Sequence, residues 1–262
     1  MRLNRTVVLA AVLAAQVASA QWTNSYGYSF NNPVSASVNQ MIWDRINQGM
    51  LLRMMLKKKG FTDEQLKGLS NEQLLAKLGG AKKAAEESKT VQLGNASKFK
   101  PAGKRLLVNE LATNLSKDPA QQKVLRELFE QSIKAFEAEA SKEGFANDLA
   151  GATAFFLGTA YYVFHDGGEP DPDGLTLVAR QLQQVFDTPE MKKAPDADKQ
   201  KLYELLIGMA GWLGVTWQVA AKENDEALKA KMKETAGSIL KGYFKLEPQQ
   251  VQITAAGLSV AR

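Results

Sequence analysis

Seven polar side chains are the candidates for chemistry in this sequence, and they stand at the ends of two uncharged stretches: Asn147, Asp148, His165, Lys199, Gln200, Tyr203 and Glu204. Lys199 and Tyr203 are four residues apart, as are Gln200 and Glu204, so each pair shares a face of a helix. If the helices carrying the two stretches are antiparallel neighbours, His165 and Asp166 would approach residues 199–204. A carboxyl group, a lysine, a tyrosine and a histidine could then carry out acid–base chemistry.

The same residues also fit structural roles. Asn147 and Asp148 directly precede an apolar run, where Asn and Asp are favoured as helix caps. A histidine at a helix C-terminus is favoured by the helix dipole, and a lysine, a tyrosine and a glutamate can form a hydrogen-bond network between helices. No spacing matches an established nucleophile, phosphate-loop or metal motif. We therefore predict a structural cluster, with no catalytic residue, cofactor or metal site.

Residue counts exclude several classes of chemistry. The chain has 262 residues, no cysteine and one histidine. Thiol catalysis, CxxC redox chemistry, cysteine-ligated zinc and HExxH zinc proteases are therefore excluded. The length suffices for a hydrophobic core that is stable without disulfides.

The first twenty residues have the pattern of a secretory signal peptide. Arg2 and Arg5 precede an apolar core, and Ala18-Ser19-Ala20 is a small-x-small cleavage pattern. We expect an exported protein, periplasmic or secreted, whose mature chain starts at Gln21. Loss of the two arginines from 33 basic residues leaves 31 against 28 acidic ones, a formal charge of +3. This charge is too small to indicate nucleic-acid binding.

Two stretches without charged residues, 149–164 and 205–221, dominate the rest of the sequence. Both are shorter than the roughly 20 apolar residues of a membrane span, so no stable span is expected after signal cleavage. A helix that is apolar all round is otherwise buried all round. We predict that the two stretches form a central helix pair that crosses closely at its glycine faces, Gly151/Gly158 and Gly208/Gly211/Gly214. A membrane-inserting protein is the alternative.

Caps and apolar periodicity predict about six helices after Phe99. Pro101, Asp118-Pro119 and Asp171-Pro172 indicate helix starts, Asp196 or Asp198 opens the second uncharged helix, and Asn224 or Asp225 caps the last one. Val251, Ile253 and Thr254 could form a short strand, but a loose tail is preferred. The predicted fold is an all-α bundle built around the buried pair, with a helical N-terminal extension.

Composition divides the chain into six parts. They are a signal peptide (1–20), an extended or disordered aromatic arm (21–33), a helical extension (34–78), a glycine- and charge-rich linker (79–98), the main helical domain (99–247) and a C-terminal tail (248–262).

Three segments together resemble a family of exported bacterial proteins known only as a domain of unknown function. They are Phe99-Lys-Pro-Ala-Gly-Lys-Arg-Leu106, Asn147-Asp148-Leu-Ala150 and Lys199-Gln200-x-x-Tyr203-Glu204. The resemblance covers about residues 99–253. It implies an exported helical domain and assigns no activity, ligand or catalytic residue.

We therefore expect a non-enzymatic envelope or extracellular interaction protein that binds another envelope protein or a cell-wall component. The oligomeric state is left open. The aromatic arm and the methionine-rich segment 38–56 are the predicted contact regions. The competing hypothesis is a hydrolase of cell-envelope polymers with Glu204 or Asp148 as its acid or base.

Overall fold

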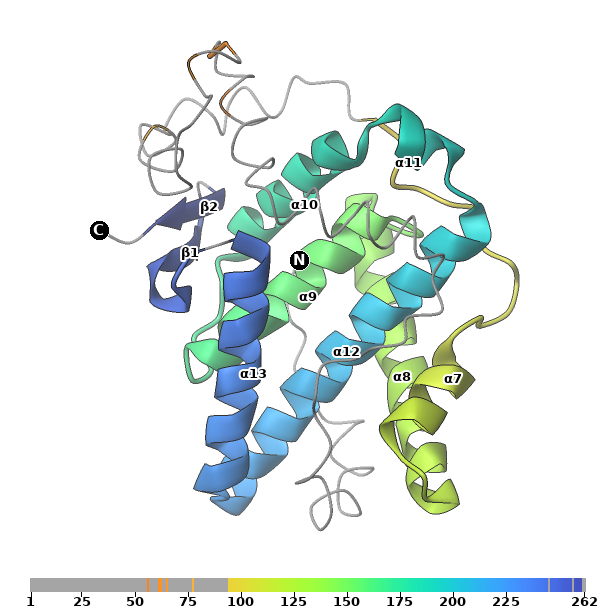
Figure 1. Cartoon of the computed structure of the whole chain (residues 1–262), viewed down its shortest axis with the longest axis vertical. Helices are drawn as coiled ribbons and strands as arrows, with labels where there is room; N and C mark the ends of the chain where they lie inside the picture. The colour runs from red at the N-terminus through yellow and green to blue at the C-terminus, as the bar shows by residue number, and fades with distance from the viewer. Residues whose placement is uncertain are drawn as a thin grey trace.

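The structure is a computed structural model that describes residues 94–244, 246–255 and 257–260, together with Leu56, Phe61, Thr62, Gln65 and Lys77. The predicted signal peptide, the aromatic arm and most of the helical extension and linker lie outside these residues. The described chain forms a bundle of helices with a small hairpin at one side (Figure 1).

Seven α-helices and one two-stranded sheet make up the described part of the chain, which confirms the all-α prediction. The helices are α7 (Val108–Leu115), α8 (Pro119–Ala140), α9 (Leu149–Phe164), α10 (Pro172–Phe186), α11 (Pro189–Lys193), α12 (Asp196–Glu223) and α13 (Glu226–Phe244). Two 3₁₀ turns, η2 (Ser141–Glu143) and η3 (Pro248–Gln250), precede α9 and the strands β1 (Val251–Thr254) and β2 (Gly257–Val260).

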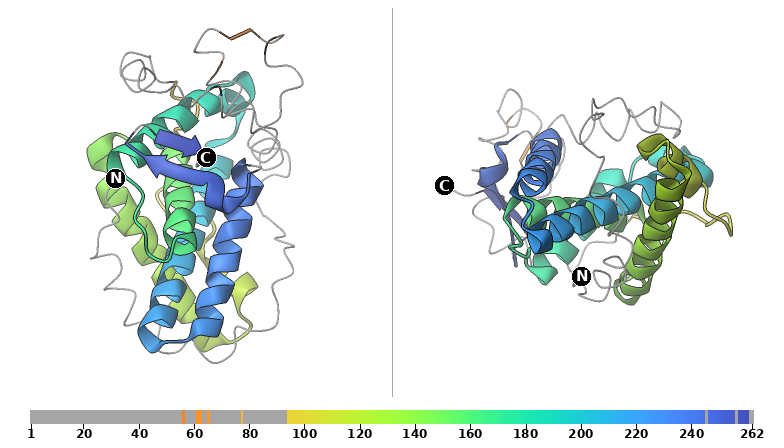
Figure 2. Two further views of the ribbon diagram at one scale, coloured as in Figure 1. Left: turned by 90° about the vertical axis from the view of Figure 1, so that its left-hand side faces the viewer. Right: turned by 90° about the horizontal axis from the view of Figure 1, so that it is seen from below.

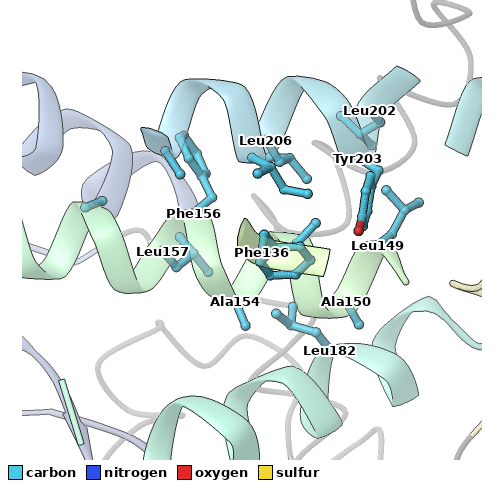
Figure 3. Packing of buried hydrophobic residues seen from close by; sticks show 14 of the residues in the cluster. Phe136, Leu149, Ala150, Ala154, Phe156, Leu157, Leu182, Leu202, Tyr203 and Leu206 are labelled. Carbon is cyan, nitrogen blue, oxygen red and sulfur yellow. The ribbon is translucent and has the colours of Figure 1, made fainter. Parts of the chain in front are cut away.

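The uncharged helix α9 lies in the middle of the bundle and packs against α10, α12 and α13 (Figure 1). Twelve of its sixteen residues are buried, so it is covered on nearly every side. Its neighbour α12 runs in the same direction. Tyr203 near the start of α12 lies over Leu149 at the start of α9 (Figure 3), and Trp217 meets Tyr162 near the two C-terminal ends, with ring centroids 5.2 Å apart. The predicted central helix pair is therefore present, and it is parallel.

The glycines of this pair do not face each other as predicted. On α9, an added Cβ at Gly158 would come within 2.9 Å of Leu175 on α10. On α12, a Cβ at Gly211 would lie 2.0 Å from the Ser132 hydroxyl oxygen of α8, and only Gly214 meets α9, at Thr159. At Gly211 the α12 backbone therefore packs against Ser132 of α8. The pattern of small residues showed where a neighbouring side chain packs against a helix backbone, but not which helix each glycine faces.

Local signals located most helix starts correctly. The Asp118 side chain accepts the Ala120 N–H at the start of α8, and the Asp171 side chain accepts the Gly174 N–H at the start of α10. Asp225 accepts the Leu228 N–H, whereas Asn224 ends α12 with a left-handed φ of 57°. Asp196, one of the two predicted starts, is the first residue of α12. One prediction needs correction: residues 101–107 are not helical, and α7 begins only at Val108.

The C-terminal residues form a hairpin instead of the preferred loose tail. β1 and β2 pair antiparallel, with Val251 opposite Val260. Val251 and Ile253 are buried, and the Asp171 N–H donates to the Ile253 carbonyl at 3.3 Å. The hairpin lies beside α10 and α13, away from α8 (Figure 2). Val251, Ile253 and Thr254, which indicated a short strand as the alternative to a loose tail, all lie in β1. The residues of this strand alternate between buried and exposed.

Residues of the N-terminal extension contribute to the same core. Leu56 is fully buried and belongs to the main hydrophobic cluster, and Phe61 packs against this cluster. Among the described residues, no helix combines the length and the hydropathy needed to cross a membrane.

Candidate functional site

The seven predicted site residues separate into two groups. Six of them surround the first turns of α9 and α12, while His165 follows the last residue of α9. Since α9 and α12 are parallel, their first turns lie together. Asp148 and His165 flank α9 at its two ends, about 25 Å apart along the helix axis. The expected approach of His165 and Asp166 to residues 199–204 is therefore wrong, because it assumed antiparallel helices.

Glu204 is fully enclosed, with no exposed surface. Its Oε2 accepts the backbone N–H groups of Leu106 and Leu107 at 2.9 and 2.8 Å. Its Oε1 accepts the Gln200 side-chain amide at 2.8 Å. Both oxygens are therefore engaged in holding the chain just before α7 against α12.

Gln200 and Lys199 bind the same incoming segment, residues 97–107, which we call the strap. Gln200 accepts the Ala102 N–H at 2.8 Å and donates to the Lys104 carbonyl at 2.7 Å. The Lys199 ammonium group donates to the Lys98 carbonyl at 3.3 Å. Burial lowers the pKa of Lys199, and the charge of Asp196 partly offsets this effect. Figure 1 shows the strap in yellow, running past the start of α12 to α7.

Asn147 and Asp148 fix the other end of the strap. Asn147 has a left-handed φ of 51°, a conformation that asparagine tolerates better than most residues. Its carbonyl accepts the Phe99 N–H at 3.1 Å. The buried Asp148 side chain caps α9 at the Ala150 N–H and accepts the Gln183 side-chain amide of α10 at 2.6 Å. The predicted cap is confirmed.

Tyr203 fills the space between the strap and the bundle. Its ring packs edge-on against Phe99 and Phe136, with centroids 5.1 and 5.7 Å apart. Desolvation is the main cause that raises the pKa of Tyr203. The phenol therefore stays protonated, and its ring acts as packing surface.

Three members of this cluster, Gln183, Arg105 and Glu137, were not predicted from the sequence. Gln183 stands within the apolar face of α10, and a polar residue in such a face is a detectable signal. Arg105 pairs with Glu137 of α8 through two hydrogen bonds of 2.8 and 3.1 Å. Hydrogen bonding to Glu137 is the largest cause of the raised pKa of Arg105. No local pattern joins residues 32 positions apart, so this pair could be found only in three dimensions.

His165 lies in a separate aromatic environment. Its ring stacks on Tyr161 and meets Phe164 edge-on, with centroids 4.2 and 5.2 Å away. Desolvation lowers the pKa of His165; a hydrogen bond with the Val251 backbone opposes this effect, and the nearby Lys233 adds to it. A neutral ring at the hairpin is thus the favoured state.

The cluster at the start of α9 and α12 provides little access for chemistry. A general acid must reach the atom that it protonates, but Asp148 and Glu204 are fully buried and already accept hydrogen bonds. Within the described residues, no group of three or more His, Cys, Asp or Glu side chains could hold a metal ion. A surface hollow of about 430 Å³ is lined by residues of α13 and the following turn (Ser238, Lys241, Gly242, Leu246 and Glu247), and none of the seven candidates lines it.

The fold and this cluster define an all-α protein whose polar centre fastens a strap across the starts of two parallel helices. The chain belongs to a family of unknown function, DUF6683, whose model matches residues 3–261. This match is longer than the resemblance seen at residues 99–253 and includes the N-terminal extension. No curated protein and no solved structure matches the chain significantly.

Proposed function

We propose that this protein is a non-enzymatic interaction protein that is exported and acts in the bacterial cell envelope or outside the cell. One observation carries the non-enzymatic part. Asp148 and Glu204, the two best candidate acids, have no exposed surface and hold the N-terminus of α9 and the strap in place. Buried polar groups that are fully engaged in such a network contribute to a unique fold.

Support for export comes from the sequence. The basic start, the short apolar core and the Ala-Ser-Ala pattern are typical of a cleaved signal peptide. A fusion of residues 1–25 to a reporter enzyme that is active only after export should be active in a bacterial host. A cytoplasmic, uncleaved fusion would contradict the proposed location.

The aromatic arm is the proposed contact region for the partner, an envelope protein or a cell-wall component. Trp22, Tyr26, Tyr28 and Phe30 stand within nine residues, and aromatic side chains are enriched in binding sites. Leu56, at the end of the methionine-rich segment, is buried in the core, so deletion of the whole extension would also disturb folding. Substitutions in the arm are therefore the cleaner test.

The experiment uses the full mature chain with all four arm aromatics changed to serine. Co-sedimentation with insoluble cell wall and crosslinking in the envelope fraction measure the two kinds of partner separately. We expect at least one signal to fall about tenfold or more, because aromatic anchors dominate interface energies. A matched variant with Asn24, Asn31 and Asn32 changed to serine should keep it. Equal binding by both variants and the wild type would exclude the arm as the contact region.

A zymogram on cell-wall material tests the competing hydrolase hypothesis. The proposal expects no clearing by the wild-type protein. A clearing band that disappears in both Glu204→Gln and Asp148→Asn proteins, while the far-ultraviolet circular dichroism stays unchanged, would replace the non-enzymatic proposal.

A further inference from the structure

The outer face of the strap carries an array of lysines. Lys98, Lys100 and Lys104 are exposed. Ser97, which precedes Lys98, and Phe99, which lies between Lys98 and Lys100, are buried. This alternation is that of an extended chain, in which every second side chain points the same way. The Cα atoms of Lys98 and Lys100 are thus about 6.6 Å apart, with both side chains on one face. Lys104 follows after the turn at Gly103.

The strap holds these lysines in place from beneath. Its backbone is hydrogen-bonded at Ser97 to Leu149 of α9, at Phe99 to Asn147 just before α9, and to α12 through Gln200 and Glu204. A segment that is already ordered loses less conformational entropy on binding than a free chain does. The lysine side chains are therefore displayed from a preorganised backbone.

These lysines also differ from many others in their charge partners. Within the described part of the chain, none of the three forms an ion pair, whereas Lys142, Lys192 and Lys241 each pair with a nearby carboxylate. From residue 88 to residue 109 the sequence has five basic residues (Lys89, Lys98, Lys100, Lys104 and Arg105) and no acidic one. The two carboxyls that bond to the strap, Glu137 and Glu204, are engaged with Arg105 and with backbone N–H groups. The three strap lysines are thus left without a carboxylate partner among the described residues.

We infer that the strap is a binding surface for a linear anionic polymer, other than a nucleic acid, that bears repeating phosphate groups. Several ammonium groups on one short segment can contact several phosphates of one chain at once, and such contacts recognise charge without a specific sequence or shape. This surface is separate from the aromatic arm, and its partner class does not depend on the arm's role.

Two observations favour a polymer over other sources of phosphate. The remaining exposed residues of the strap are Pro101, Ala102 and Gly103, so the strap has no large apolar side chain to insert into a bilayer. The N–H groups of Ala102, Leu106 and Leu107 are bonded inward, so they cannot form a cradle for a single phosphate ion. Binding must come from several lysines at once, which favours a chain of charges.

The test measures binding of the full mature protein to linear inorganic polyphosphate as a function of salt. The wild type is compared with a triple variant, Lys98→Gln, Lys100→Gln and Lys104→Gln. The control triple variant is Lys123→Gln, Lys134→Gln and Lys222→Gln, three exposed lysines on α8 and α12. Each variant removes three positive charges, so the net charge of the two variants is equal. Thermal unfolding checks that both fold as the wild type does.

We expect the strap variant to bind about tenfold or more weakly at low salt, and the slope of log K against log salt to become shallower by about 2. The control variant should stay close to the wild type, and monomeric phosphate at equal phosphate concentration should not compete. Equal losses in both triple variants would show that only net charge matters and would overturn the inference. So would binding to phosphatidylglycerol vesicles in the absence of polyphosphate binding.

Discussion

Glu204 of α12 accepts a 2.8 Å hydrogen bond from the backbone N–H of Leu107, a residue 97 positions earlier in the chain. Leu107 directly precedes α7, which has no side-chain cap of its own. N–H groups at a helix start have no partner within the helix. The residue that first suggested an acid catalyst therefore acts as the N-terminal acceptor of a distant helix.

Replacement of Glu204 by glutamine should destabilise the protein. The new amide group would bring two donors toward N–H groups that need an acceptor, and hydrogen bonds to charged groups contribute about 1.5–3 kcal/mol. We expect the free energy of unfolding in urea to fall by about 2–3 kcal/mol. Glu127→Gln, an exposed change on α8, should leave it within about 0.5 kcal/mol. Equal stability of both variants would show that the buried bonds are not needed.

The contact between α8 and α12 depends on the missing side chain at Gly211. A Cβ there would lie 2.0 Å from the Ser132 oxygen and 2.7 Å from its Cβ, so Gly211→Ala must push the helices apart. Overpacking of this kind costs about 1–3 kcal/mol, which exceeds the gain in helix propensity. Gly242→Ala is the matched control, because its Cβ meets nothing within 4 Å and should raise stability by up to about 1 kcal/mol. Chemical denaturation of both variants should give shifts of opposite sign.

Gly174 sets the distance between α10 and the hairpin. An added Cβ would lie 1.9 Å from the Thr254 carbonyl oxygen, which belongs to backbone and cannot rotate away. We expect Gly174→Ala to displace the hairpin while α9 and α12 keep their packing. Hydrogen–deuterium exchange should therefore increase at residues 251–260 much more than at residues 149–164. A uniform increase over both regions would mean that the hairpin does not move independently.

His165 should make stability depend on pH as the pH falls below about 7. The pKa of His165 is lowered in the folded protein, chiefly by desolvation, so the unfolded chain binds the proton first as pH falls through about 6.5. The free energy of unfolding should fall in this window, with a slope of at most about 1.4 kcal/mol per pH unit for one proton. His165→Phe keeps the ring contacts with Tyr161 and Phe164 and should flatten the profile. An unchanged profile in this variant would assign the pH dependence to another group.

Several features of the fold could be predicted from sequence because their causes are local. The uncharged run 149–164 predicted a buried central helix, and α9 covers this run. Asp118 and Asp171 marked helix starts through caps that involve only residues two or three positions away. The strap was less predictable. Pro101 suggested a helix, but residues 101–107 obtain their hydrogen bonds from Gln200 and Glu204, almost a hundred positions later.

The sequence by itself determined the all-α class, the central helix pair and the polar residues at their ends, since periodicity, capping and charge are properties of short segments. Only the tertiary structure decided that α9 and α12 are parallel, which separates His165 from Glu204 and brings Asp148 close to Tyr203. Helix direction depends on how α10 and α11 return the chain across the bundle, and no local pattern encodes that path. The same long-range contacts convert Glu204 from a candidate acid into the group that holds the strap.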